Sequence, residues 1–297
     1  MTPKLSRVGL GTNNFGRRLD LEATRAVVDA ALDAGVTHFD TADIYGGGDS
    51  ERFLGEILKG RRDQVFLATK FGMAEGGGGS PEYVRQAIDA SLERLQTDRV
   101  DLYYYHRPDG VTPIVETVGA MQELVDAGKV GALGVSNFDP DQLREAAGAA
   151  PIFAVQNEYN LLERGARSDV LPTARKLGVG FVPYFPLAHG LLTGKYRRGE
   201  PAPEGTRLHD RQELLTEERF DKIETLERFA AARGHPLLEL AIGALASEPG
   251  VLSVIAGATK PEQVRANAAA SEWHLNASDL AALQGASGGI MVVRVAF

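Results

Sequence analysis

The chain has 297 residues, 43% of them hydrophobic and 24% charged, so it can bury the core of a globular protein. Its net charge of −8 argues against a general nucleic-acid or anionic-membrane partner, and the absence of cysteine excludes disulfides, zinc–cysteine sites and cysteine nucleophiles. The first residues lack a signal-peptide pattern and no stretch approaches membrane-spanning length, which predicts a cytoplasmic protein.

Short β-branched or aromatic runs alternate with amphipathic segments of helical length along the chain. The predicted strands cover residues 7–11, 36–41, 65–70, 100–106, 130–136, 152–156, 179–184 and 251–256. The predicted helices cover residues 21–34, 50–59, 80–95, 114–127, 139–147, 166–177, 217–233, 237–247 and 261–270. Eight strand–helix units predict a (β/α)8 TIM barrel in one domain, residues 1–297. An open doubly wound sheet is the alternative, because local patterns do not show closure.

Ionisable residues stand at the ends of three successive predicted strands, namely Asp40, Lys70 and His106. The C-terminal ends of barrel strands converge on one face, so we expect these side chains to lie close together. Tyr45 follows Asp40 by five residues, on a turn that continues into three glycines. A tyrosine has a pKa of about 10, and a nearby ammonium group lowers it. The pattern predicts a tuned proton donor beside a carbonyl-binding position.

Seven segments resemble the signature segments of the aldo-keto reductase family, and the match runs in chain order from about Val8 to Ala270. They are HFDTADIYGGGDSERFLG, FLATKFG, VDLYYYHRPD, VGALGVSNF, AVQNEYN, FVPYFPLAHGLLTGKY and SVIAGATKPEQVRANAAA. The resemblance implies a (β/α)8 barrel that reduces aldehydes and ketones, or reversibly oxidises alcohols or sugars, with NADPH and without a metal. It implies that Tyr45 is the general acid, that Lys70 and Asp40 tune it, and that His106 positions the carbonyl.

The resemblance also implies a cofactor site. Ser136, Asn137 and Gln156 would bind the nicotinamide carboxamide, and Tyr184 would stack on the ring. The pyrophosphate loop would contain Phe185, Leu187, Gly190, Leu191, Thr193, Gly194 and Lys195. The adenine and 2′-phosphate end would contain Gly257, Thr259, Lys260, Gln263 and Asn267. The end of the first strand, Gly11, Thr12 and Asn13, is assigned to the same site.

Two of these positions depart from the family pattern. Phe185 stands where many relatives carry serine, which removes one hydrogen bond to the pyrophosphate. Gln263 stands where some relatives have arginine, so contact with a 2′-phosphate depends on Lys260 or Arg265. NADPH is therefore the expected cofactor and NADH the alternative.

Rival interpretations have weaker support. The glycines at 9, 11 and 16 have the wrong spacing for a dinucleotide-binding fingerprint, and GLLTGKY is one residue short of a phosphate-binding loop. Two alternatives stay open: a Schiff-base aldolase barrel with Lys70 as nucleophile, and a non-catalytic cofactor-sensing subunit of the same fold.

Substrate selectivity is expected from the loops at 13–18, 107–112 and 185–212. The apolar tail, residues 285–297, fits a flap over the site, an edge strand or a subunit contact. Asp43 is interpreted as a turn residue, and residues 75–80 as a mobile loop. The expected partner is a small carbonyl compound or sugar, and the expected assembly is a monomer or small homo-oligomer.

Overall fold

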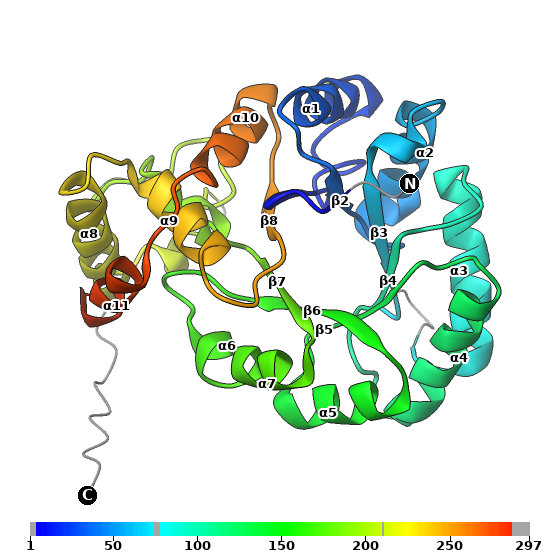
Figure 1. Cartoon of the computed structure of the whole chain (residues 1–297). Helices are drawn as coiled ribbons and strands as arrows, with labels where there is room; N and C mark the ends of the chain where they lie inside the picture. Colours follow the sequence, from blue (N-terminus) through cyan, green and yellow to red (C-terminus); the bar gives the residue numbers. More distant parts are fainter. Residues whose placement is uncertain (1–3, 74–77, 210, 287–297) are drawn as a thin grey trace, which may run out of the picture.

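The computed structural model describes residues 4–73, 78–209 and 211–286. Within them, parallel strands form a closed barrel in the order β1 to β8, and helices surround it (Figure 1). The strands are β1 (Val8–Gly11), β2 (His38–Asp40), β3 (Phe66–Phe71), β4 (Leu102–Tyr105), β5 (Leu133–Ser136), β6 (Ile152–Glu158), β7 (Gly180–Tyr184) and β8 (Val254–Gly257). Because β1 pairs with both β2 and β8, the barrel prediction is confirmed and the open-sheet alternative is wrong.

The helices follow the strands much as predicted. They are α1 (Leu21–Asp33), α2 (Asp49–Ile57), α3 (Pro81–Leu95), α4 (Ile114–Asp126), α5 (Pro140–Ala149), α6 (Gly165–Ser168), α7 (Val170–Leu177), α8 (Glu217–Ala231), α9 (Leu237–Ala246), α10 (Pro261–Ala270) and α11 (Ala277–Ala286). Capping side chains mark the starts of two of these helices. The Ser80 side chain accepts from the Tyr83 N–H at the start of α3, and Asp139 and Gln142 form a capping box on α5.

The structure differs from the predicted helices in two places. The helix expected at 166–177 is divided into α6 and α7, because Asp169 between them has a non-helical backbone (φ −125°, ψ −75°). Helix α11 was not predicted, and its last residues, Gly285 and Ala286, begin the segment interpreted as an apolar tail. Residues 287–297 of that tail and 75–77 of the expected mobile loop lie outside the described residues.

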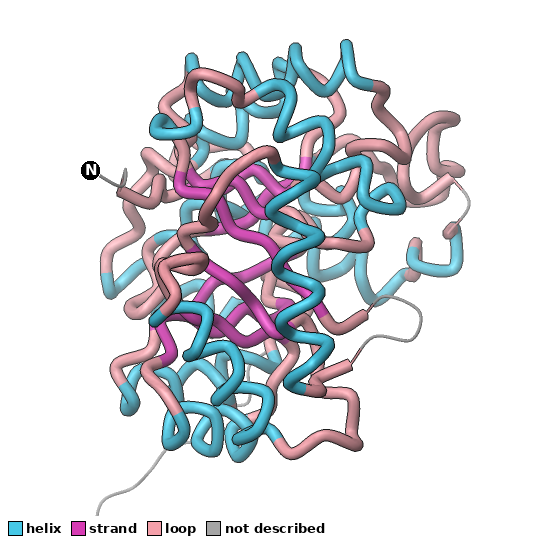
Figure 2. The backbone as a smooth tube through the Cα atoms, turned by 90° about the vertical axis from the view of Figure 1, so that its right-hand side faces the viewer, coloured by secondary structure: helices cyan, strands magenta, loops and turns pink. Residues whose placement is uncertain are grey.

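Apolar side chains pack on both sides of the barrel wall. Figure 2 shows the strands enclosed by helices. A small cluster that includes Phe66, Tyr104 and Ile255 packs together, and a larger cluster packs the strands against the surrounding helices. A separate cluster joins the segment after β7 to α8, α9 and α11, which lie together at one side of the barrel (Figure 1). Burial on both faces explains why these strands read as nearly continuous apolar runs. Across the described ranges, no helix is long and apolar enough to cross a membrane.

Candidate active site

A cleft of about 1150 Å³ opens over the C-terminal ends of the strands. Its lining comes from the ends of β1, β2 and β4 to β8 and from the loops that follow them. In a barrel of this kind, catalytic residues gather at this face. Tyr45 and His106 line the cleft, and so does Asp40 from the end of β2.

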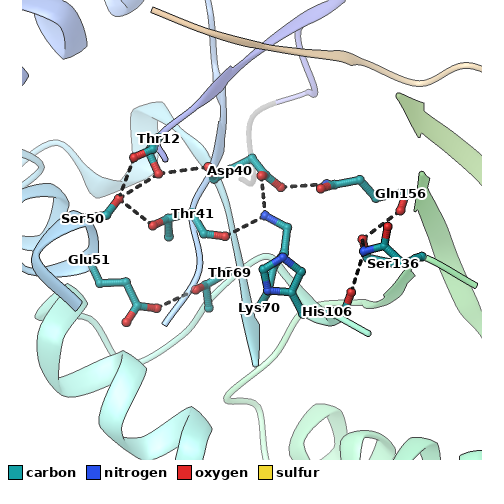
Figure 3. A network of polar contacts seen from close by, with 11 residues as sticks. Thr12, Asp40, Thr41, Ser50, Glu51, Thr69, Lys70, His106, Ser136 and Gln156 are labelled. Carbon is teal, nitrogen blue, oxygen red and sulfur yellow. Dashed lines mark hydrogen bonds and ion pairs between the residues drawn. The ribbon is translucent and has the colours of Figure 1, made fainter. Parts of the chain in front are cut away.

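Below the cleft, Lys70 and Asp40 form a buried ion pair (Figure 3). Their side chains are 0% and 3% exposed, so the pair is shielded from water. The Lys70 ammonium donates to Asp40 and also to the Thr41 carbonyl, at 2.8 Å. The Gln156 amide donates to the second Asp40 oxygen, at 2.8 Å. Asp40 is thus fixed by two donors from different strands, and Lys70 is held charged beneath the cleft.

Tyr45 lies directly above this pair. The Lys70 Nζ atom is 5.1 Å from the centre of the Tyr45 ring, and the ring meets that of His106 edge-on with centroids 6.0 Å apart. The tyrosine begins a 3₁₀ turn, Tyr45–Gly48, in which Gly46 and Gly47 have φ values of 60° and 67°. Such positive φ values suit glycine, so the glycine run fits the turn that carries Tyr45.

Burial sets the protonation states of these groups. It raises the pKa of Tyr45 above its usual value of 10.0, while Lys70 opposes that shift. Burial lowers the pKa of Lys70, but Asp40 and Tyr45 outweigh it and the net pKa is raised. Burial, aided by Lys70, lowers the pKa of His106 to about 3. At neutral pH the site therefore holds a protonated phenol, an ammonium and a neutral imidazole.

Ser50 and Glu51, at the N-terminal end of α2, form hydrogen bonds with residues next to the ion pair (Figure 3). The Ser50 hydroxyl lies 2.8 Å from the Thr12 hydroxyl and 2.9 Å from that of Thr41, whose carbonyl receives the Lys70 ammonium. Glu51, buried on the same helix, accepts from the hydroxyl of Thr69, the neighbour of Lys70. These hydrogen bonds connect the residues around Lys70 to α2.

Glu51 also pairs with Arg94 of α3, at 2.6 Å. Asp43 lies in the turn before Tyr45, as interpreted from the sequence, but one of its carboxylate oxygens is buried without a hydrogen-bond partner. Burial raises the pKa of Asp43 to about 6, and Glu51 adds to the shift.

The ends of β5 to β7 bring together the residues assigned to the nicotinamide. The Ser136 hydroxyl donates to the Gln156 carbonyl at 2.8 Å. The Asn137 amide donates to the His106 carbonyl at 2.9 Å, and its oxygen accepts from the Tyr184 hydroxyl at 2.7 Å. The Tyr184 ring is therefore oriented at the wall of the cleft, with its hydroxyl anchored to the residue beside Ser136.

Most residues assigned from the sequence line this one cleft. From the pyrophosphate and adenine groups, the lining residues are Phe185, Leu187, Gly190, Thr193, Lys195, Gly257, Thr259, Lys260, Gln263 and Asn267. From the end of the first strand, Gly11, Thr12 and Asn13 line it too. Three assigned residues do not. Lys70 is fully buried below, Leu191 belongs to the hydrophobic cluster with α8 and α9, and Gly194 lies outside the lining.

Several lining residues were not singled out from the sequence, among them Asn14, Arg18, Arg107, His189 and Arg207. Arg207 donates to the side-chain oxygens of Asn13 and Asn14, at 3.5 and 3.1 Å, and lies over the Phe185 ring at 5.8 Å. These residues fall within the loops expected to set selectivity, but nothing in the sequence shows which of their side chains face the cleft.

Three cations that line the cleft, Lys195, Arg207 and Lys260, form no ion pair within the described ranges. Lys260 also precedes α10, whose free backbone N–H groups favour an anion. A phosphate-bearing dinucleotide fits this donor set. No group of three or more His, Asp or Glu suited to a metal ion occurs in the part of the chain that the structure describes.

Comparisons with known proteins agree with this geometry. The chain is 38% identical over 290 residues to aldo-keto reductase YhdN of Bacillus subtilis, covering 92% of this chain and 87% of that protein. It is 37% identical over 273 residues to a probable voltage-gated potassium channel subunit beta of Oryza sativa subsp. japonica, covering 85% and 83%. The structure of glycerol dehydrogenase AKR11B4 from Gluconobacter oxydans matches with a TM-score of 0.85 and 30% identity, covering 95% of this chain and 91% of that chain. A model of the Aldo/keto reductase family matches residues 7–287, so the resemblance is confirmed and the chain belongs to this family.

Proposed function

We propose that the protein is an NADPH-dependent reductase of aldehyde or ketone carbonyls, with Tyr45 as the general acid. The observation that carries the proposal is the buried Lys70–Asp40 pair beneath a protonated Tyr45, beside a neutral His106. The family and the dehydrogenase among the structural relatives support an oxidoreductase. Oxidation of alcohols or sugars is the reverse of the same reaction.

The cofactor would supply the hydride that attacks the carbonyl carbon. In this proposal Tyr184 holds the nicotinamide ring, and Ser136, Asn137 and Gln156 hold its carboxamide. Lys195, Arg207 and Lys260 would bind the phosphate groups of the cofactor. A 2′-phosphate would be bound by Lys260 or Arg265, which is why NADPH is proposed over NADH.

Tyr45 gives its proton to the carbonyl oxygen, and Lys70 stabilises the phenolate that forms. His106 is neutral, so it can donate a hydrogen bond to the same oxygen without carrying a charge. Its Nδ1 atom is buried without a hydrogen-bond partner, so the donor to the carbonyl oxygen would be the Nε2–H group. The chain thus provides Tyr45 as the proton donor, His106 as a hydrogen-bond donor and Lys70 as the cation that stabilises the phenolate.

The test is Tyr45→Phe, assayed by NADPH absorbance with a panel of aldehydes. We expect reduction to slow by about 10²- to 10⁴-fold, because a general acid contributes this much. Cofactor affinity, measured by nicotinamide fluorescence, should be retained in this variant and weakened in Tyr184→Ala. Near-normal turnover of Tyr45→Phe would refute the assignment.

A cofactor-sensing subunit is the second candidate, because the chain resembles a protein named as a potassium channel subunit. Cofactor binding without oxidation of NADPH by any aldehyde of the panel would favour it. The Schiff-base alternative has less support, because a nucleophilic lysine must lose its proton and Asp40 raises the pKa of Lys70. A stable adduct on Lys70 after borohydride treatment with a carbonyl substrate would revive it.

Cytoplasmic location, a single domain and a monomer or small homo-oligomer stay predictions of the sequence.

A further inference from the structure

The proposed cofactor site leaves one half of the cleft for the substrate. The residues assigned to the nicotinamide, pyrophosphate and adenine come mainly from the ends of β5 to β8. The other half is built from the ends of β1 to β4 and the loops after them. Beyond Tyr45, His106 and the end of β1, its described lining consists of Asn14, Arg18, Met73 and Arg107, along with Asp40.

This substrate half carries uncompensated positive charge. Arg18 and Arg107 line it, and neither pairs with a carboxylate anywhere in the described ranges. Asp40 is the one acidic residue among the described lining of this half, and Lys70 already neutralises it. The charge of these two arginines is opposite in sign to the net charge of the chain, which is −8.

Many arginines outside the cleft form ion pairs. Arg94 pairs with buried Glu51, and Arg175 pairs with Glu248. Arg198 alone contacts three carboxylates of α8. Arg18 and Arg107 have no carboxylate partner among the described residues, so each guanidinium can bind an anion that is not part of the protein.

Arg107 is the arginine closest in sequence to the reacting atoms. It directly follows His106, so the two Cα atoms are about 3.8 Å apart. The His106 backbone is fixed on both sides, since its N–H donates to the Phe71 carbonyl and its carbonyl accepts from Asn137. Burial raises the pKa of Tyr184 to about 12 and the Arg107 charge opposes this shift, so the two side chains interact electrostatically.

We propose that the substrate is an aldehyde or ketone with an anionic oxygen group, a carboxylate or a phosphate, and that Arg107, assisted by Arg18, binds this group while Tyr45 and His106 bind the carbonyl. A guanidinium suits both anions because its parallel N–H groups can donate to two oxygens at once. Arg207 is assigned to the cofactor side, because it lies over the ring of Phe185, which follows β7. This inference rests on the proposed reductase function and specifies its substrate.

Two matched pairs of aldehydes test it, with the full chain and NADPH. Butanal is compared with succinic semialdehyde for the carboxylate, and glyceraldehyde with glyceraldehyde 3-phosphate for the phosphate. The readout is the ratio of kcat/KM for the anionic compound to that for its neutral partner. We expect at least one ratio above about 10 in the wild type, and a fall of about 10- to 100-fold in Arg107→Ala, because charge-assisted hydrogen bonds are worth this much. The pair with the higher ratio identifies the anion.

Arg144→Ala serves as the control. It removes the same charge from an exposed residue of α5 that lies outside the cleft, so its ratios should match those of the wild type. Raising the NaCl concentration from 50 to 300 mM should lower the wild-type ratio, since Arg18 and Arg107 are exposed to solvent.

Three results would overturn the inference. The first is reduction of the neutral aldehydes with both ratios near 1 and unchanged in Arg107→Ala, which leaves the reductase function standing. The second is a loss of NADPH affinity in Arg107→Ala larger than the fall in the ratio, which would assign Arg107 to the cofactor. The third is no NADPH oxidation with any of the four aldehydes, which would overturn the reductase function as well.

Discussion

Lys70→Met removes the ammonium group of the buried pair and keeps most of the side-chain length. In the wild type this group donates to Asp40 and to the Thr41 carbonyl. The variant leaves the Asp40 carboxylate, in a residue that is 2% exposed, with the Gln156 amide as its remaining side-chain donor. Breaking a buried ion pair in this way costs about 3–5 kcal/mol, because the remaining charge has no partner. We therefore expect the free energy of unfolding to fall by this amount.

Urea denaturation at pH 7 measures the change, and a double-mutant cycle with Asp40→Asn shows its origin. The double variant has no buried charge at either position, so it should be more stable than the sum of the two single losses indicates. A Lys70→Met variant within about 1 kcal/mol of the wild type would refute the reasoning. It would mean that the carboxylate takes up a proton or reaches water at little cost.

Two other perturbations probe the strands and the turn around the site. Gly46→Ala places a Cβ atom 2.5 Å from the Phe15 carbonyl oxygen, whereas Gly47→Ala meets nothing within 4 Å and has a similar φ. Urea denaturation should show that the first variant loses about 1–3 kcal/mol more than the second, and equal losses would contradict the close contact. For His38, burial lowers the pKa from 6.5 to about 4 in the folded state. The unfolded chain takes up a proton below about pH 6.5, so stability should fall as the pH falls from 6.5 to 4, by about 2 kcal/mol at pH 5. A His38→Asn variant should lose less between pH 7 and pH 5, and an identical pH dependence would exclude this role.

The sequence predicted where the candidate catalytic residues lie better than it predicted their pKa values. Asp40 and His106 stand where runs of buried strand residues end, and such boundaries are visible in the pattern of residues. Parallel strands bring their ends together, so the meeting of Asp40, Lys70 and His106 follows once the barrel is assumed. Closure of the barrel depends on pairing between β1 and β8, which are about 240 residues apart, and no local pattern carries that information.

Other features depend on side-chain direction and burial. Arg18 and Arg107 lie in loops that the sequence marks as variable, but the same residues could equally face solvent away from the cleft. The break at Asp169 was missed because the apolar spacing continues across it, although the backbone there is not helical. A lysine near Tyr45 predicted a lower pKa, whereas the structure gives a higher net value because burial is the larger effect.

The raised pKa of Tyr45 keeps the phenol protonated at neutral pH, as the proposed role of general acid requires. A general acid must hold its proton until the carbonyl oxygen gains negative charge, and a phenol with a pKa below 7 would already have lost it. Lys70 opposes the effect of burial, so its charge is most useful when the phenolate forms, after the proton has left. An interaction that strengthens during the reaction lowers the barrier, whereas one equally strong in the ground state would not. Burial of Tyr45 over a charged Lys70 therefore combines a stable acid with a stabilised conjugate base.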